Sequence, residues 1–185
     1  MKQLKMIRPC APVTELPLPA GYRYEMYCGA PEQIEDWKTI CKNGLIRPED
    51  DADDRFRAMI LERDGVHPTE DLFFIVDDTG RRVATTAAVK REDGIGNVHM
   101  VASLPETRGK GLGHIMISHT LAMIEARGVP YTYLTTDDFR VAAVKVYLDA
   151  GFLPVIYEDP ESDMTDRWNK MLELLHYPPV EYLSE

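Results

Sequence analysis

The hydrophobic pattern divides the chain into segments with two different periods. Alternating residues and short apolar runs bounded by turn residues predict six strands, at 21–28, 71–76, 82–89, 98–102, 131–136 and 152–157. Apolar residues spaced three and four apart predict five helices, at 31–42, 55–63, 114–127, 139–150 and 167–175. Asp138 is the expected N-cap of the fourth helix, which places Phe139 on its apolar face.

The order of these elements indicates the fold class. A helical N-terminal part is followed by a meander of strands and then by strand–helix–strand–helix–strand, which is a mixed α/β arrangement around one sheet. The 185 residues fit a single domain. Residues 1–20, which contain four prolines, are expected to form an extended N-terminal arm, and residues 158–185 a variable C-terminal extension.

Composition excludes several classes of partner. The formal net charge is −10, and an acidic surface repels phosphate backbones, so no nucleic acid is expected. No apolar run is long enough for a membrane span, and the N-terminus lacks an apolar signal core, so no membrane is expected. Cys10, Cys28 and Cys41 show no metal or disulfide spacing and favour a cytoplasmic location and core positions. His114 and His119 are five residues apart, so no metal site is predicted.

A basic, glycine-rich turn precedes the third helix. The segment RGKGLG places three glycines among Arg108 and Lys110, and a helix N-terminus with such a turn can hold phosphate oxygens. Gly113 is not followed by Lys and Ser/Thr, which excludes a P-loop. The third glycine of a dinucleotide fingerprint would fall at His114 or Met116, which excludes that motif too.

Two motifs carry a resemblance to a known family. The turn reads R-x-x-G-x-G at the end of a strand, and a later segment, RVAAVKVYLDAGF, follows at the right distance. Together they resemble the GNAT superfamily of acyl-CoA-dependent N-acyltransferases over residues 98–152. The matching positions are Arg108, Gly111 and Gly113 in the first motif and Ala143, Tyr147, Gly151 and Phe152 in the second.

The resemblance implies a fold and a cofactor site. It implies one GNAT-like domain with a mostly antiparallel sheet, a splayed parallel pair of strands and helices on both faces. It also implies acetyl-CoA as co-substrate, with the turn holding the pyrophosphate and the preceding strand pairing with the pantetheine arm. The residues assigned to coenzyme A in this way are Val101, Ala102, Ser103, Arg108, Gly109, Lys110, Gly111, Leu112, Gly113, His114 and Arg140.

The sequence departs from the family pattern in two places. The usual Asn of the second motif is Arg140, which puts the usual amide contact in doubt. The family's final strand is not evident after Tyr157, so either residues 176–183 supply a late strand or the C-terminal edge is rebuilt.

The resemblance supplies one candidate for the chemistry, and residue type and position supply the others. Tyr147 is the expected general acid beside the thioester sulfur, although its helix position also fits a core residue. His99 is the candidate base, since its ordinary pKa suits the task. Weaker alternatives for the base are Asp137, Asp138, Glu70 and Asp71. The acidic run 49–54 either attracts a cationic amine or is a solvated loop whose acids favour the next helix start.

These observations predict an acetyl-CoA-dependent N-acetyltransferase that acts on a primary amine of a small molecule or peptide. The alternative is a non-catalytic GNAT-fold protein that binds acyl-CoA, and a general nucleotide-binding protein is disfavoured by the glycine spacing. The resemblance also allows a homodimer.

Overall fold

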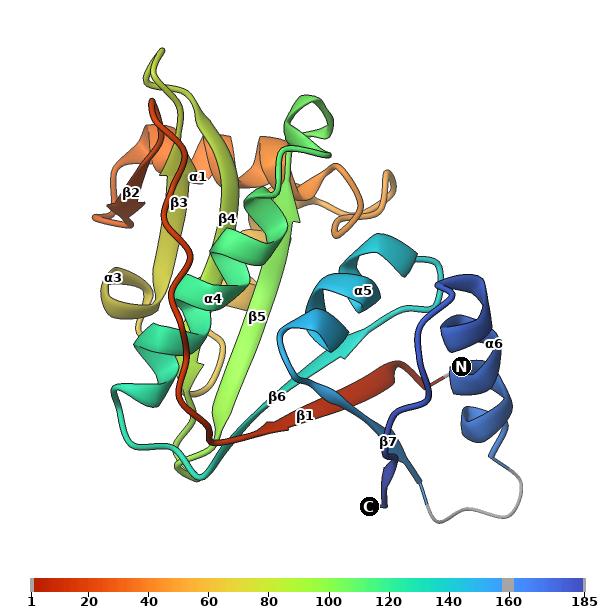
Figure 1. The fold of residues 1–185 in the computed structure, drawn as a ribbon. Coiled ribbons are helices and arrows are strands. Elements are labelled where there is room, and N and C mark those ends of the chain that lie inside the picture. The colour runs from red at the N-terminus through yellow and green to blue at the C-terminus, as the bar shows by residue number, and fades with distance from the viewer. Residues whose placement is uncertain (1, 158–161, 185) are drawn as a thin grey trace.

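The computed structural model describes residues 2–157 and 162–184, and within them eight strands form one mixed sheet (Figure 1). The strand order is β2-β3-β4-β5-β6-β1-β7-β8. Neighbouring strands are antiparallel except for the pairs β5–β6 and β7–β8. The strands are β1 Leu4–Pro9, β2 Arg23–Met26, β3 Leu72–Val76, β4 Arg82–Lys90, β5 Gly96–Ser103, β6 Tyr131–Thr136, β7 Leu153–Ile156 and β8 Leu183–Ser184.

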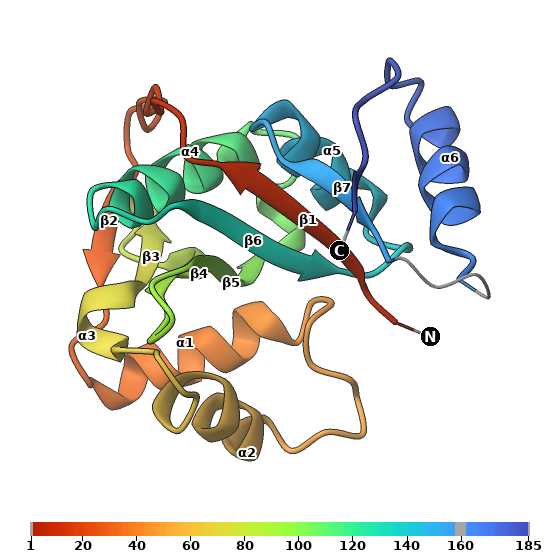
Figure 2. The same ribbon diagram turned by 90° about the horizontal axis from the view of Figure 1, so that it is seen from below.

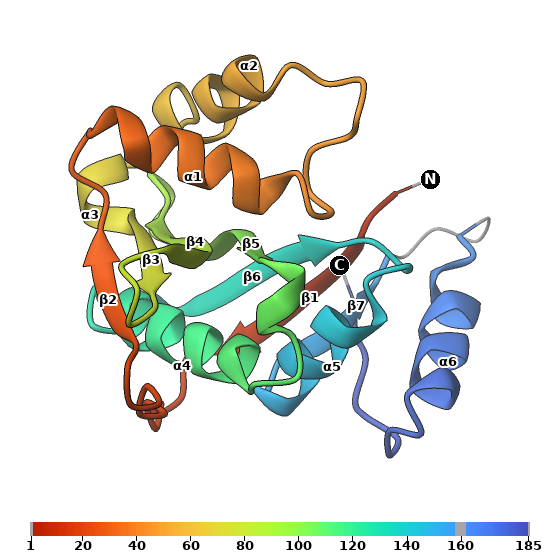
Figure 3. The same ribbon diagram turned by 90° about the horizontal axis from the view of Figure 1, so that it is seen from above.

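Helices cover both faces of this sheet. Seen from below and above, α1 and α2 lie on one face, and α4 and α5 lie on the other (Figures 2 and 3). Helices on both faces are what the family resemblance implies. The helices are α1 Pro31–Cys41, α2 Ala52–Phe56, α3 Pro68–Asp71, α4 Leu112–Glu125, α5 Val141–Asp149 and α6 Met164–Leu174. A π-helical turn, η1 Arg57–Leu61, continues α2, and a 3₁₀ turn, η2 Pro105–Thr107, precedes the glycine-rich turn.

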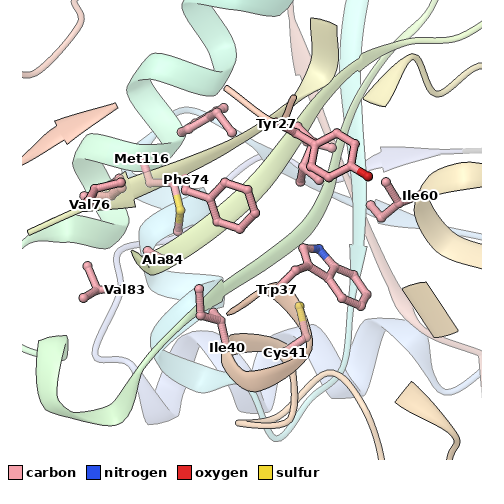
Figure 4. Close-up of a cluster of buried hydrophobic side chains, with 14 of the residues drawn as sticks. Tyr27, Trp37, Ile40, Cys41, Ile60, Phe74, Val76, Val83, Ala84 and Met116 are labelled. Atoms are coloured by element: carbon pink, nitrogen blue, oxygen red, sulfur yellow. The ribbon is translucent and has the colours of Figure 1, made fainter. Parts of the chain in front are cut away.

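Two hydrophobic clusters hold the layers together. One lies between β3–β4 and the helices α1 and α2, where Trp37, Ile40 and Phe74 are fully buried (Figure 4). The other joins β1, α4, α5 and α6 around Trp168 and Phe152. The helix α1 begins at a proline, which has no N–H to leave unpaired at a first helical position. Burial of these large side chains is the main stabilising contribution to the sheet–helix contacts.

The N-terminal segment differs from the expectation of an extended arm. Residues Leu4–Pro9 form β1, which pairs with β6 along its whole length and also with β7. Leu4 and Met6 are fully buried, and Arg8 is bound to Glu125 of α4, so β1 is an interior strand. The proline-rich part, residues 11–19, has no strand or helix, as expected.

The C-terminal edge is rebuilt around this strand. Residues Leu183 and Ser184 form the two-residue strand β8, which pairs with β7. Strand β1 lies between β6 and β7 in the sheet. The helix expected at 167–175 is present as α6, which begins three residues earlier and ends one residue earlier. Residues 158–161 and 185 of the predicted extension lie outside the described residues. No helix among the described residues is long and apolar enough to cross a membrane.

The start of α5 corrects the predicted helix boundary. The helix begins at Val141, its N-cap is Arg140, and no side chain caps it. Asp138 is instead paired with Arg167 of α6, at 2.6 Å and 2.9 Å. Phe139 therefore precedes the helix, where it is exposed rather than on an apolar face.

Candidate active site

The two parallel strands β5 and β6 separate soon after they meet. Their ladder contains only the pairs Gly96–Thr132 and Asn97–Tyr133, although both strands continue for several residues (Figure 1). An added Cβ at Gly96 would lie 2.5 Å from Ile124 Cγ2 and 2.6 Å from Thr132 Oγ1, so only glycine fits where the strands meet α4. The side-chain amide of Asn97 donates to the Tyr133 carbonyl oxygen at 3.2 Å and ties the strands at this point. The predicted splay is therefore present.

A bulge in β5 lies further along the open part of the strand. Between the pairs Thr85–Ala102 and Ala87–His99, β5 advances three residues while β4 advances two. Met100 has a φ of 56°, in the left-handed region that non-glycine residues seldom adopt. Such a bulge leaves backbone groups out of the ladder and redirects the strand. No glycine or asparagine in the sequence signals it.

The glycine-rich turn leads into α4 with left-handed backbone at two positions. Gly109 and Gly111 have φ values of 77° and 76°, and Gly111 is the N-cap of α4. The next three residues start the helix, so their N–H groups have no partner within it. A Cβ at Gly113 would lie 3.4 Å from Val146 Cγ2, which places α4 and α5 in close contact here. Free amides and the helix dipole make this end suited to an anion.

One cavity of about 810 Å³ connects these features. It runs from the glycine-rich turn along the open part of β5 to α5. Ten of the eleven residues predicted to bind coenzyme A line it, and Lys110 does not. Twelve of the described lining residues were not predicted as site residues, and no motif in the sequence signals three of them, Asn43, Gly44 and Leu45. The others include Phe139, which precedes α5, and Lys145, which belongs to it.

Tyr147 lines the same cavity from the middle of α5. Its side chain is only 6% exposed, and burial raises its pKa to about 12. Its ring makes an edge contact with Phe152, with 6.1 Å between the ring centroids. No other described residue forms a hydrogen bond with its hydroxyl. Tyr147 is therefore a protonated donor beside the cavity at neutral pH.

Comparison with known proteins identifies the family. The model of the acetyltransferase (GNAT) family matches residues 32–152, which is most of the chain. The chain belongs to the GNAT acetyltransferase family. This GNAT chain is 26% identical over 183 residues to a mycothiol acetyltransferase of Frankia casuarinae, covering 90% of this chain and 51% of the relative. A mycothiol acetyltransferase of Thermobispora bispora is 35% identical over 86 residues, which cover 43% of this chain and 29% of the relative.

Solved structures of GNAT proteins have the same fold. A GCN5-related N-acetyltransferase from Sphaerobacter thermophilus superposes with a TM-score of 0.63 at 19% identity, over 82% of this chain and 47% of that one. A GCN5-related N-acetyltransferase from Kribbella flavida superposes with a TM-score of 0.56 at 24% identity. The match covers 89% of this chain and 60% of that one. The GNAT chain thus spans about half the length of several of these relatives.

His99 does not lie on the GNAT cavity. Its Nε2 is 3.0 Å from the Met59 carbonyl oxygen of η1, on the side of α1 and α2. Burial, together with the Arg63 charge, lowers its pKa to about 4. The imidazole is therefore neutral and does not line the cavity, which does not favour a catalytic base at this position.

Three of the four alternative carboxylates, those of Asp71, Asp137 and Asp138, have structural partners. Asp71 is fully buried and paired with Arg127, and it accepts from the His67 backbone N–H at 2.7 Å. Asp137 accepts from Gln3 and pairs with Arg140 at 2.9 Å. Among the described residues that line the cavity there is no carboxylate.

The acidic run 49–54 caps a helix. Asp51 is the N-cap of α2, and its Oδ1 accepts from the backbone N–H groups of Asp53 and Asp54 at 2.9 Å and 3.0 Å. Lys38 of α1 is bound to Asp53 at 2.6 Å. These contacts agree with the second alternative, a solvated loop whose acids favour the next helix start. No residue of the run lines the cavity.

The remaining predicted features have mixed outcomes. Cys41 is buried, as expected, and burial raises its pKa well above the usual thiol value. Cys10 and Cys28 are exposed, so the prediction of core positions was wrong for these two. The described residues contain no group of three or more His, Cys, Asp or Glu side chains placed to hold a metal ion.

Proposed function

We propose that this chain transfers an acetyl group from acetyl-CoA to a primary amine of a small molecule or peptide. The observation that carries the proposal is the single cavity that joins the glycine-rich turn to Tyr147. One end offers backbone amides at a helix N-terminus, which suit phosphates. The other end offers a protonated hydroxyl, which suits a leaving thiolate. Acetyl-CoA would supply the activated acetyl group as a thioester.

The turn fits coenzyme A phosphates on its own geometry. Gly109 and Gly111 have positive φ, and an added Cβ at either would meet no atom within 4 Å, so the space above the turn is open. Arg108 lines this end and donates to the Asn43 carbonyl oxygen at 3.3 Å, which ties the turn to the loop after α1. The turn is thereby held in a conformation whose N–H groups and cationic side chain serve an anion.

The open part of β5 would orient the acyl carbonyl. Beyond Asn97 the strand has no ladder with β6, so its backbone groups on that side are available to a ligand. The bulge at Met100 and Val101 adds N–H groups that are out of register with β4. Fixed donors of this kind stabilise the negative charge that develops on a carbonyl oxygen during acyl transfer.

Tyr147 would donate a hydrogen bond to the leaving sulfur. With a pKa of about 12 the hydroxyl remains protonated throughout the neutral range. The amine must lose a proton to attack, and none of the described residues that line the cavity is a carboxylate, so solvent takes that proton in this account. Holding both reactants in one cavity lowers the entropic part of the barrier.

A release assay tests the proposal. Free thiol is measured after mixing the protein with acetyl-CoA and a panel of amines, beside calorimetry with acetyl-CoA alone. Because the curated relatives are named mycothiol acetyltransferases, an acceptor of that type belongs on the panel with polyamines, amino acids and peptide N-termini. Amine-dependent thiol release is expected, and the absence of acetyl-CoA binding would contradict the assignment.

A second candidate function is acyl-CoA binding without turnover. It is favoured by Arg140, which stands where the family motif has Asn and whose guanidinium is bound to Asp137. Acetyl-CoA binding without thiol release across the whole panel would support this candidate over the enzyme.

A further inference from the structure

The side chain of Phe139 is exposed although it lies at the cavity. It is 74% exposed, more than any other large hydrophobic side chain among the described residues, and Leu174 follows at 63%. Leu174 is on the outer surface of α6, whereas Phe139 lines the 810 Å³ cavity. An aromatic ring left in water beside a cavity forgoes the stabilisation that burial would give it. A ligand that covers the ring would recover this stabilisation.

One neighbouring side chain, Arg140, contacts a face of this ring. The guanidinium of Arg140 lies over the ring of Phe139, 5.2 Å from its centroid, and is itself paired with Asp137 at 2.9 Å. Since the ring is mostly exposed, its other face is open. A cation on one face and a flat ligand on the other are compatible, because both interact with the same π system.

The position of Phe139 indicates which part of a ligand would cover it. In the proposed function the phosphates lie at Gly111 and the thioester at Tyr147, so the nucleoside lies beyond the phosphates, toward the mouth of the cavity. The segment before α5, which contains Phe139, lines the same cavity as the glycine-rich turn. Phe139 and Tyr147 are the only Phe or Tyr side chains that line the cavity among the described residues.

We propose that Phe139 is the platform on which the adenine ring of coenzyme A stacks. This inference rests on the proposed function and adds a residue that sets affinity for the nucleotide end of the co-substrate. Stacking of a base on an aromatic side chain contributes about 1–3 kcal/mol, so removal of the ring should change affinity by about 5- to 150-fold. The pantetheine end would not depend on it.

The test is calorimetry with two ligands and five proteins. Coenzyme A and pantetheine, which lacks the nucleotide, are titrated into the wild type and into Phe139→Ala, Phe139→Tyr and Phe139→Leu. Leu174→Ala removes a similarly exposed apolar side chain away from the cavity and is the matched control. Tyr keeps the flat ring, whereas Leu keeps apolar area without it.

The proposal expects a pattern specific to the nucleotide. The Kd for coenzyme A should rise about 5- to 150-fold in Phe139→Ala and nearly as much in Phe139→Leu, with less than a twofold change in Phe139→Tyr. The Kd for pantetheine should not change in any variant. An unchanged Kd for coenzyme A in Phe139→Ala, or an equal loss for both ligands, would overturn the proposal while leaving the proposed function intact. Failure of the wild type to bind coenzyme A would overturn both.

Discussion

Replacement of Tyr147 by Phe separates a catalytic hydroxyl from a core tyrosine. The change removes one oxygen and keeps the ring that packs against Phe152. No described residue is hydrogen-bonded to this hydroxyl, so the folded protein loses no internal hydrogen bond. The free energy of unfolding should therefore change by less than about 1 kcal/mol.

The expected loss of activity follows from the raised pKa. A hydroxyl with a pKa of about 12 is a weaker acid than a thiol, whose pKa is about 8.5, so complete proton transfer to the thiolate is unfavourable. Tyr147 then acts as a hydrogen-bond donor to developing charge. Hydrogen bonds to charged groups contribute about 1.5–3 kcal/mol, which corresponds to about 10- to 150-fold in kcat. We expect a loss near 100-fold.

The assay is steady-state thiol release at saturating acetyl-CoA, with the Kd for acetyl-CoA and the urea midpoint measured on the same samples. Tyr27→Phe is the matched control, because Tyr27 is also 6% exposed but lies in the other core cluster and away from the cavity. A fall in kcat below threefold, with unchanged affinity, would assign Tyr147 to packing. A similar fall in Tyr27→Phe would show that the loss is indirect.

Two further predictions concern stability. Gly96→Ala should lower the free energy of unfolding by about 1–3 kcal/mol, measured by urea denaturation, because its Cβ would overlap Ile124 and Thr132 where the strands meet; a neutral effect would contradict the tight contact. The pKa of His99 is lowered by burial and by Arg63 to about 4, so the unfolded state binds the proton first as the pH falls. Stability should accordingly be lost between pH 6.5 and pH 4, by up to about 3 kcal/mol, and His99→Gln should flatten that dependence. An equally steep decline in the variant would refute the contribution of His99.

Sequence patterns located most of the sheet and the cavity because those parts depend on local signals. Alternation and apolar runs marked β2 to β7, and the glycines of the turn marked the start of α4. The two motifs then brought together residues from β5, α4 and α5 that line one cavity. Each of these signals lies within a few residues of the structure it predicts.

Features that depend on distant contacts were not predictable. The segment Leu4–Pro9 reads as the start of a proline-rich arm, and it becomes an interior strand only because the gap between β6 and β7 accepts it. Asp138 is of a residue type that often caps helices, but its carboxylate is bound to Arg167, which is 29 residues away. His99 has a suitable ordinary pKa, and only the packing of η1 above it reveals that it is neutral and hydrogen-bonded.

Calorimetric titration of acetyl-CoA into wild type and Gly111→Glu tests the central claim most directly. The variant places a carboxylate at the N-terminus of α4, where the account puts the phosphates. Gly80→Glu is the control, because Gly80 has a φ of 85°, near the 76° of Gly111, and an added Cβ meets no atom within 4 Å at either position, so the backbone strain is matched. The account predicts binding by the wild type and by Gly80→Glu and none by folded Gly111→Glu. Equal affinity in all three proteins would contradict it.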